Sequence, residues 1–274
     1  MSLSVEIFHV LLLCLVLGLN VARADEKLVI CGTGDSQELC QNLAAEFMGS
    51  HPGVNIEVPE AIGSSGGIKA TAAGKCDLGR VARPLRDNEL RYGLHYKAYA
   101  LSPVVLAVNG GVSHPDNLSG KELVQIYQGG INDWRQLGGP PGKIYVANRE
   151  QGDSSRQVLE QMVPGFAAIK RPVGSIIYTT PELVQTLINH EQTIGYTSLA
   201  QVKRQPSIRV LKFEGYSPSE ENISSGHYPL LATFGLVWRD SLKPLGHDFL
   251  TFLATSTARQ LMSEYGVAPP DILP

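Results

Sequence analysis

A serine- and glycine-rich stretch, Gly63-Ser64-Ser65-Gly66-Gly67, has the residue types best suited to chemistry in this chain. Glycines let a backbone approach a ligand closely, and serines at a helix start present hydroxyl and free N–H groups. A helix N-terminus also favours negative charge. Because alternating apolar residues precede the stretch and small residues follow it, we expect a strand, a turn that cradles an anion, and a helix.

The same stretch has a competing interpretation as a catalytic motif. It matches G-x-S-x-G, the nucleophile elbow of α/β hydrolases, in which Ser65 would be the nucleophile. That elbow follows several strands of its sheet, whereas only about two predicted strands precede Ser65. No histidine lies in a recognisable motif. A serine hydrolase is therefore the less favoured alternative, and a turn that only caps a helix is the structural one.

Two further strand–turn–helix units bring polar groups to strand ends. The first is an apolar strand at 28–31, a turn at 32–36 and a helix over about 37–48, with Asp35 and Glu38 spaced like a capping box. The second is a strand at 143–147, a turn with Arg149 at its start, and a helix that ends near Met162. Each unit is predicted to point hydrogen-bond donors out of a strand end.

The remaining pattern alternates strands with helices, which indicates an α/β protein. The long apolar run 99–108 is predicted to be a central strand, and Asn109-Gly110-Gly111, which breaks it, is a candidate hinge. Thr180 is the expected cap of a helix that continues through Pro181. Further helices are expected at 118–127, 180–189, 243–253 and 256–265, further strands at 193–196, 208–213 and 230–238, and a polar loop at 216–227.

Composition narrows the class of protein. The chain has 274 residues, 43% of them hydrophobic, and a net charge of −3, so it carries no basic footprint for nucleic acid. An apolar run at 7–19 is shorter than the roughly 20 residues of a membrane span. It precedes Ala22-Arg23-Ala24, so we expect a signal peptide over 1–24 and an exported protein.

Three cysteines follow that segment: Cys31, Cys40 and Cys76. They allow one disulfide with one thiol left over, or three buried small hydrophobic side chains. Their spacings match no metal site, and we expect neither a metal nor another cofactor.

Taken together, these motifs resemble one family, the phosphate-binding proteins of ABC importers, within the type II periplasmic binding proteins. The order and spacing of the matching segments carry the resemblance over nearly the whole chain after the leader. The segments are residues 32–36, 62–67, 77–79, 83–85, 117–119, 131–134, 149–152 and 194–196.

The resemblance implies a fold of two α/β lobes with a ligand cleft between them. The first lobe would comprise 25–108 plus 228–274, and the second 109–227. The implied function is a periplasmic, monomeric solute-binding protein that captures inorganic phosphate or a close oxyanion and delivers it to an ABC transporter permease. Such a protein is not an enzyme. The same fold binding another small anion and serving a membrane sensor is the alternative.

The family's anion site carries over onto particular positions. Ser36 and the N–H of Gln37 fall at the first helix start, and Ser64, with Ser65 beside it, falls at the second. Arg149 falls where the second lobe supplies an arginine, whose planar fork pairs two oxyanion oxygens. Asp153, Ser154 and Ser155 stand where the family often has Ser-Gly-Thr.

The sequence also departs from the family in its acidic residue. Ala82 stands where phosphate-specific members commonly carry an aspartate that accepts a proton of the bound phosphate. One hypothesis is that Asp153 replaces this acceptor. The alternative is that Asp153 only caps its helix.

Overall fold

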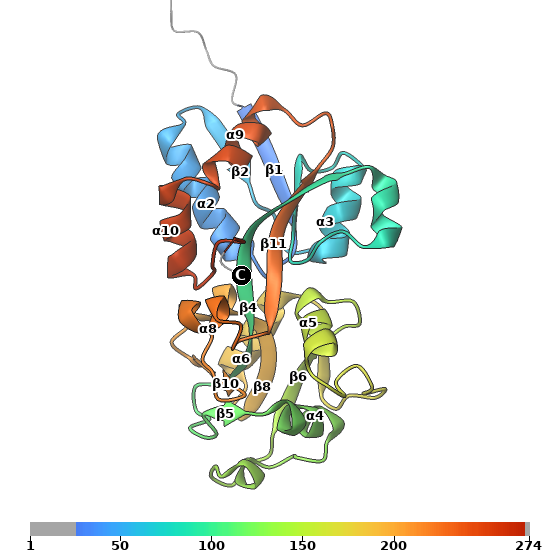
Figure 1. Ribbon diagram of the computed structural model, residues 1–274, viewed down its shortest axis with the longest axis vertical. Helices are drawn as coiled ribbons and strands as arrows, with labels where there is room; N and C mark the ends of the chain where they lie inside the picture. The colour runs from blue at the N-terminus through green and yellow to red at the C-terminus, as the bar shows by residue number, and fades with distance from the viewer. Residues whose placement is uncertain (1–25, 272–274) are drawn as a thin grey trace, which may run out of the picture.

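The computed structural model describes residues 26–271, so the expected signal peptide over 1–24 lies outside the described residues. A nine-stranded mixed sheet in the order β2-β1-β3-β11-β4-β8-β6-β7, with β9 paired to β4, runs through the molecule. Helices pack on the sheet in two halves stacked along the long axis (Figure 1). The α/β prediction is confirmed. Within 26–271 no helix is long and apolar enough to cross a membrane.

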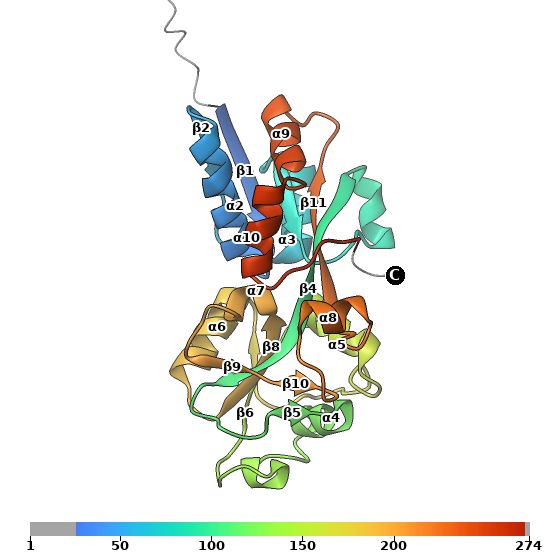
Figure 2. The same cartoon turned by 60° about the vertical axis from the view of Figure 1, so that its left-hand side comes forward.

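The first half contains both chain ends of the described segment. Strands β1 (Glu26–Gly32), β2 (Val54–Glu57) and β3 (Leu78–Val81) are parallel, and β11 (Leu231–Trp238) is antiparallel to β3. Helices α2 and α10 flank this sheet on one side and α3 on the other (Figures 1 and 2). The bounds are α2 Gln37–Ser50, α3 Gly63–Ala72, η1 Asp87–Tyr92, α9 Pro244–Phe252 and α10 Ser256–Glu264.

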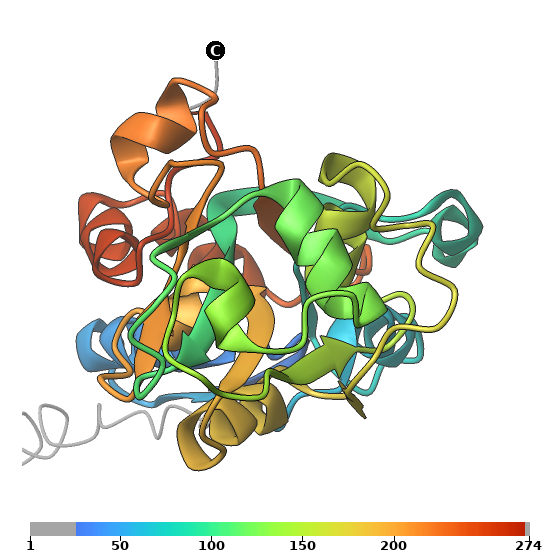
Figure 3. The same ribbon diagram turned by 90° about the horizontal axis from the view of Figure 1, so that it is seen from below.

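The second half is built on β6 (Tyr145–Arg149) and β8 (Thr193–Ser198), which pair in parallel. Seen from below, α4 lies across the end of the molecule far from β1 (Figure 3). Its other elements are β5 Asn117–Leu118, α4 Gly120–Gln128, η2 Trp134–Leu137, α5 Ser154–Met162, β7 Ser175–Ile177, α6 Thr180–Asn189, α7 Leu199–Val202, β9 Ile208–Val210, β10 Lys212–Phe213 and α8 Glu220–Ser224.

One long strand, β4 (His95–Asn109), joins the two halves. Its residues 95–103 pair with β11, whereas 104–108 pair with β8. The change of partner therefore falls at 103/104, whereas the lobe boundary after residue 108 stays a prediction. Asn109-Gly110-Gly111 lies at the far end of β4, where Gly110 N donates to Ser207 O at 2.8 Å. β4 crosses between the halves without a break. The glycines therefore lie at the end of this strand and not at the crossing between the halves.

Buried apolar side chains extend through both halves along β4. The largest hydrophobic cluster includes Leu28 and Phe47 in the first half and Trp134 and Tyr196 in the second. Val104, on β4, belongs to the same cluster. The two halves thus share a continuous core beside the crossing strand.

Helix ends follow local sequence signals, with two instructive exceptions. Ser119 and Glu122 form the expected capping box of α4, and Gly129 ends that helix with a φ of 84°. Thr179, not Thr180, caps α6, because its side chain accepts from Glu182 N. Asp35 makes no capping contact with α2. The polar segment 216–227, expected to be a loop, contains α8.

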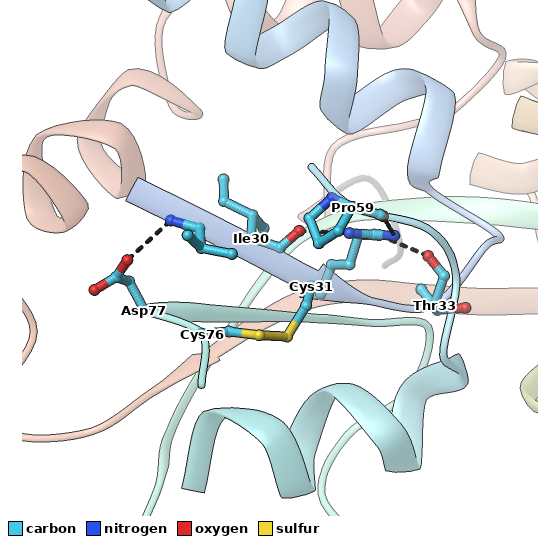
Figure 4. The surroundings of a disulfide bond; sticks show 8 residues. Ile30, Cys31, Thr33, Pro59, Cys76 and Asp77 are labelled. Carbon is cyan, nitrogen blue, oxygen red and sulfur yellow. Dashed lines mark hydrogen bonds between the residues drawn. A yellow bond between two sulfur atoms is a disulfide. The ribbon is translucent and has the colours of Figure 1, made fainter. Parts of the chain in front are cut away.

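A disulfide joins Cys31 on β1 to Cys76, just before β3, and Cys40 is a free, buried thiol. Figure 4 shows the bond beside Asp77, whose carboxylate accepts from Val29 N at 2.8 Å. Because β1 and β3 are neighbours in the sheet, the two cysteines lie with Cα atoms 6.1 Å apart. The sequence left this pairing open.

Candidate anion-binding site

A cavity of about 80 Å³ lies between the two halves. Residues 33–34 and 61–66 line it from the first half, and the loop after β6 and residues 178–180 line it from the second. A volume of this kind of about 10–15 Å³ holds one water, so the cavity has room for a small anion. A larger hollow of about 430 Å³ between β4 and α10 is lined mainly by apolar groups and lacks this clustering of donors.

The serines of the opening motif sit at the first turn of α3. No side chain caps this helix, so its first N–H groups are available near the cavity. Ser64 Oγ lies 3.0 Å from Ser154 Oγ and accepts from Ala82 N at 3.0 Å. Ser65 Oγ accepts from Arg83 Nη2 at 2.9 Å. Both serines line the cavity.

Close packing of backbones explains one of the glycines. A Cβ on Gly67 would lie 2.7 Å from Gly32 Cα. Only a residue without a side chain lets α3 pack this closely against the end of β1. The glycine therefore holds the serines at the cavity edge.

Arg149 is the cation of the site. It ends β6, is 4% exposed, and lines the cavity. Its Nη1 donates to Thr180 Oγ1 at 3.0 Å and its Nη2 to Asp153 Oδ2 at 2.7 Å. Its Nε has no hydrogen-bond partner among residues 26–271. The guanidinium thus keeps one N–H group that no residue of the described chain satisfies.

Asp153 makes two contacts at once. Its Oδ1 accepts from Arg156 N at 3.0 Å, which caps α5, and its Oδ2 pairs with Arg149. The carboxylate also lines the cavity. Both oxygens are already engaged, so capping and pairing account for this residue without a ligand.

The other predicted residues take different positions. Ser154 lines the cavity, whereas Ser155, Ser36 and Gln37 do not. Ser155 is buried and its hydroxyl has no partner within the described chain. Ser36 is fully buried beside Tyr99, and Gln37 N donates to Gly34 O at 3.1 Å. The first half instead presents Thr33 and Gly34 to the cavity.

The sequence places Asp35 beside the first helix start, but it did not predict that Thr180, which lines the cavity, links Asp35 to Arg149. Thr180 Oγ1 donates to Asp35 Oδ1 at 2.8 Å across the two halves, while it accepts from Arg149. Burial, together with the charge of Asp153, raises the pKa of Asp35 to about 6, and Arg149 offsets part of this rise. The sequence signal for this link is Thr179-Thr180-Pro181. The first threonine caps α6, which leaves the hydroxyl of the second to bond to other residues.

Other contacts also join the halves. Arg86, in the first half, donates to Gly152 O at 3.0 Å and to Gln157 Oε1 at 2.9 Å. A Cβ on Gly34 would lie 2.8 Å from Pro181 Cδ, so the two halves touch there. The two halves therefore lie in contact around the cavity, and we call this arrangement closed.

The hydrolase alternative finds no support in this geometry. The Ser65 hydroxyl accepts from Arg83, which a buried ion pair with Glu89 holds in place at 2.7 Å. None of the residues that line the cavity is a histidine. A nucleophilic serine needs a general base within hydrogen-bond reach, and Ser65 has none among these residues.

A family model for the PBP superfamily domain matches residues 20–257. The chain belongs to this superfamily. Among its relatives is the phosphate-binding protein PstS of Bacillus subtilis, 24% identical over 253 residues, which cover 90% of this chain and 82% of the relative. Relatives of this kind are solute-binding proteins.

Two solved structures have the same fold. One, from Clostridium perfringens, is assigned as a phosphate ABC transporter substrate-binding protein and holds bound phosphate; its TM-score is 0.81 and its identity 24%, with 89% of this chain and 99% of that chain covered. The other is an ABC-type phosphate transport receptor from Vibrio cholerae, with a TM-score of 0.65, 26% identity, and coverage of 89% and 100%.

Proposed function

We propose that this protein is an exported solute-binding protein that captures inorganic phosphate, or a close oxyanion, in the cavity between its halves for delivery to an ABC transporter permease. The single observation that carries the proposal is Arg149, a buried guanidinium that lines the cavity with Nε unpartnered within residues 26–271. A planar guanidinium is the side chain best matched to an oxyanion.

Neutral donors complete the proposed site. The α3 N-terminus contributes N–H groups, and the hydroxyls of Ser64, Ser65 and Ser154 surround the same cavity. Ser36, Gln37 and Ser155 would join them only if the halves shift on binding, since these residues do not line the cavity in the closed arrangement. Local dipoles of this kind hold an anion even in a weakly acidic protein.

The capture mechanism we infer is closure of two lobes about the crossing strands. The lobes would be the two halves, with the boundary in β4 moved to 103/104 and the return through β11. On binding, the oxyanion would take over donors that now serve partners within the protein. The contacts of Arg86 and of Thr180 across the halves would hold the closed state.

Another small anion, read out by a membrane sensor, remains a second candidate. The observation that favours it is Ala82, a buried apolar residue at the position where an acidic acceptor is expected for phosphate. Periplasmic location and a monomeric state belong to the first proposal and rest on the same resemblance.

A thermal-shift screen of refolded protein tests the proposal and separates these candidates. A ligand that binds only the native state raises the melting temperature by mass action. We expect phosphate to raise it, with sulfate, molybdate and small carboxylates as comparisons. A rise with a carboxylate but not with phosphate would favour the second candidate.

A further inference from the structure

Arg149, the cation that lines the cavity, is linked to two acids, an unusual balance for an anion site: Asp153, which also lines the cavity, and Asp35, which does not. Glu150 is the other acid in the lining. Asp153 contacts Arg149 directly, and Asp35 reaches it through Thr180. An incoming anion therefore meets a guanidinium whose charge two carboxylates already balance. One of these negative charges must be screened or lost for tight binding.

The two acids differ in how fully they are engaged. Both oxygens of Asp153 accept hydrogen bonds, from Arg156 N and from Arg149. Asp35 is 1% exposed, and its Oδ2 has no partner at hydrogen-bond geometry among residues 26–271, although the nearby Thr33 hydroxyl lowers the pKa of this carboxyl. A buried carboxylate oxygen without a donor is the atom best placed to take up a proton.

The hydrogen bonds around Asp35 have a fixed direction. Arg149 donates to Thr180 Oγ1, so the single proton of that hydroxyl is directed to Asp35 Oδ1. Thr180 thereby couples the state of Asp35 to the guanidinium that would hold the ligand. The groups that face Asp35 are Arg149 from β6, Asp153 from the start of α5, Thr180 from α6, Thr33 from its own turn, and Ser198 from β8, while Arg80 on β3 donates to the Thr33 carbonyl.

We propose that Asp35 is a positioning residue that takes up a proton when the anion binds, so that anion capture by this protein is coupled to proton uptake. This inference rests on the proposed anion-binding function. A new negative charge near Arg149 disfavours the ionised form of Asp35 further. The proton moves from solvent to Oδ2, and the site then holds one anion, one guanidinium and one remaining carboxylate.

The expected consequence is a pH dependence with a defined sign. Burial already holds the pKa of Asp35 near 6 in the free protein, and the bound anion raises it. Affinity is then highest below about pH 6 and falls as pH rises, by at most about tenfold per unit, until the pKa of the bound state is passed. In Asp35→Asn this contribution is absent.

The test is isothermal titration of refolded protein with inorganic phosphate between pH 5 and pH 8, in two buffers of different ionisation enthalpy. The number of protons taken up is compared between wild type and Asp35→Asn, because the proton equilibrium of phosphate itself is common to both. Asp248→Asn, an exposed aspartate on α9, is the matched control for net charge. Asp35→Ala serves as a second neutral variant, and melting curves at pH 5 establish that each variant is folded.

We expect wild type and Asp248→Asn to take up more protons than Asp35→Asn near pH 7.5, and this difference to vanish towards pH 5. Equal proton uptake in wild type and both Asp35 variants, with all of them binding phosphate, would overturn the role of Asp35 while the anion-binding proposal stands. Absence of phosphate binding in wild type at every pH would overturn both.

Discussion

Ser64 and Ser154 meet across the two halves, hydroxyl to hydroxyl, with their Oγ atoms 3.0 Å apart. Ser64 lies at the start of α3 and Ser154 at the start of α5, so two helix N-termini face one cavity. Each hydroxyl could exchange this hydrogen bond for one to an oxygen of a bound anion. In the proposed function, this pair joins the two halves and also contacts the ligand.

Ser154→Ala should therefore weaken phosphate binding by about tenfold, or about 1.5 kcal/mol, since one hydrogen bond to a charged ligand is lost. Titration calorimetry measures the change. Ser113→Ala, an exposed serine outside the cavity, is the control and should bind as wild type. Unchanged affinity in Ser154→Ala would remove this hydroxyl from the site.

Gly34→Ala should hinder closure rather than folding. The added Cβ would lie 2.8 Å from Pro181 Cδ and 2.9 Å from Thr180 Cβ, both in the other half. We expect weaker phosphate binding and a larger radius of gyration in solution scattering. Gly49→Ala, where a Cβ meets nothing within 4 Å, is the matched control. The same radius in both variants would argue against this contact as a limit on closure.

Thr179 and Thr180 both line the cavity, but only Thr180 bonds to Arg149, so we expect the two residues to affect stability and binding in different proportions. Thr179→Ala removes the cap of α6 and should cost about 1 kcal/mol of unfolding free energy. Thr180→Val removes the hydroxyl between Arg149 and Asp35 and should change phosphate affinity more than Thr179→Ala does. Urea unfolding and calorimetry on both variants make the comparison. The reverse ranking of affinities would contradict the assignment of these neighbours.

Reduction should destabilise the first half. The disulfide closes a segment with a sequence separation of 45. The chain-entropy account then gives about 4 kcal/mol of stabilisation. We expect a Cys31→Ser, Cys76→Ser double variant to melt at a lower temperature than wild type, and wild type with reductant to behave alike. Cys40→Ser, which leaves the bond intact, controls for loss of a buried thiol.

Asp35 should also make the unfolding free energy of the ligand-free protein depend on pH. Its folded pKa of about 6 lies above the ordinary value, so the folded state binds the proton more tightly than the unfolded state does. Stability from this residue is full below about pH 4 and is lost as pH rises through 6, by about 3 kcal/mol. The unfolding free energy of wild type relative to Asp35→Asn should fall over that range. A flat difference between pH 4 and pH 7 would contradict the pKa assignment.

Local signals in the sequence located much of the cavity. Ser64, Ser65, Arg149, Asp153 and Ser154 all line it, because Arg149 ends β6 and the others lie in the segments that follow β2 and β6. Glycine and serine turns between an apolar strand and a helix carry that information within a few residues of chain.

The features that the sequence did not predict depend on contacts between segments that are distant in the chain. Nothing in an unbroken apolar strand marks residue 103 as the crossing point, since the strand stays extended while its partners change. Of two adjacent threonines, either can cap a helix, so Thr180 could not be assigned to Arg149 and Asp35. The pairing of Cys31 with Cys76 required knowing that β1 and β3 are neighbours.

The most direct test of the central claim is calorimetric titration of inorganic phosphate into refolded wild type and into Arg149→Lys. The lysine keeps the charge but loses the planar fork, so the variant should bind at least about tenfold more weakly. Arg135→Lys, at an exposed ion pair in the same half, is the control. Saturable binding by wild type that Arg149→Lys weakens is the predicted result. Equal affinity in the two proteins, or no binding of phosphate by wild type, would contradict the account.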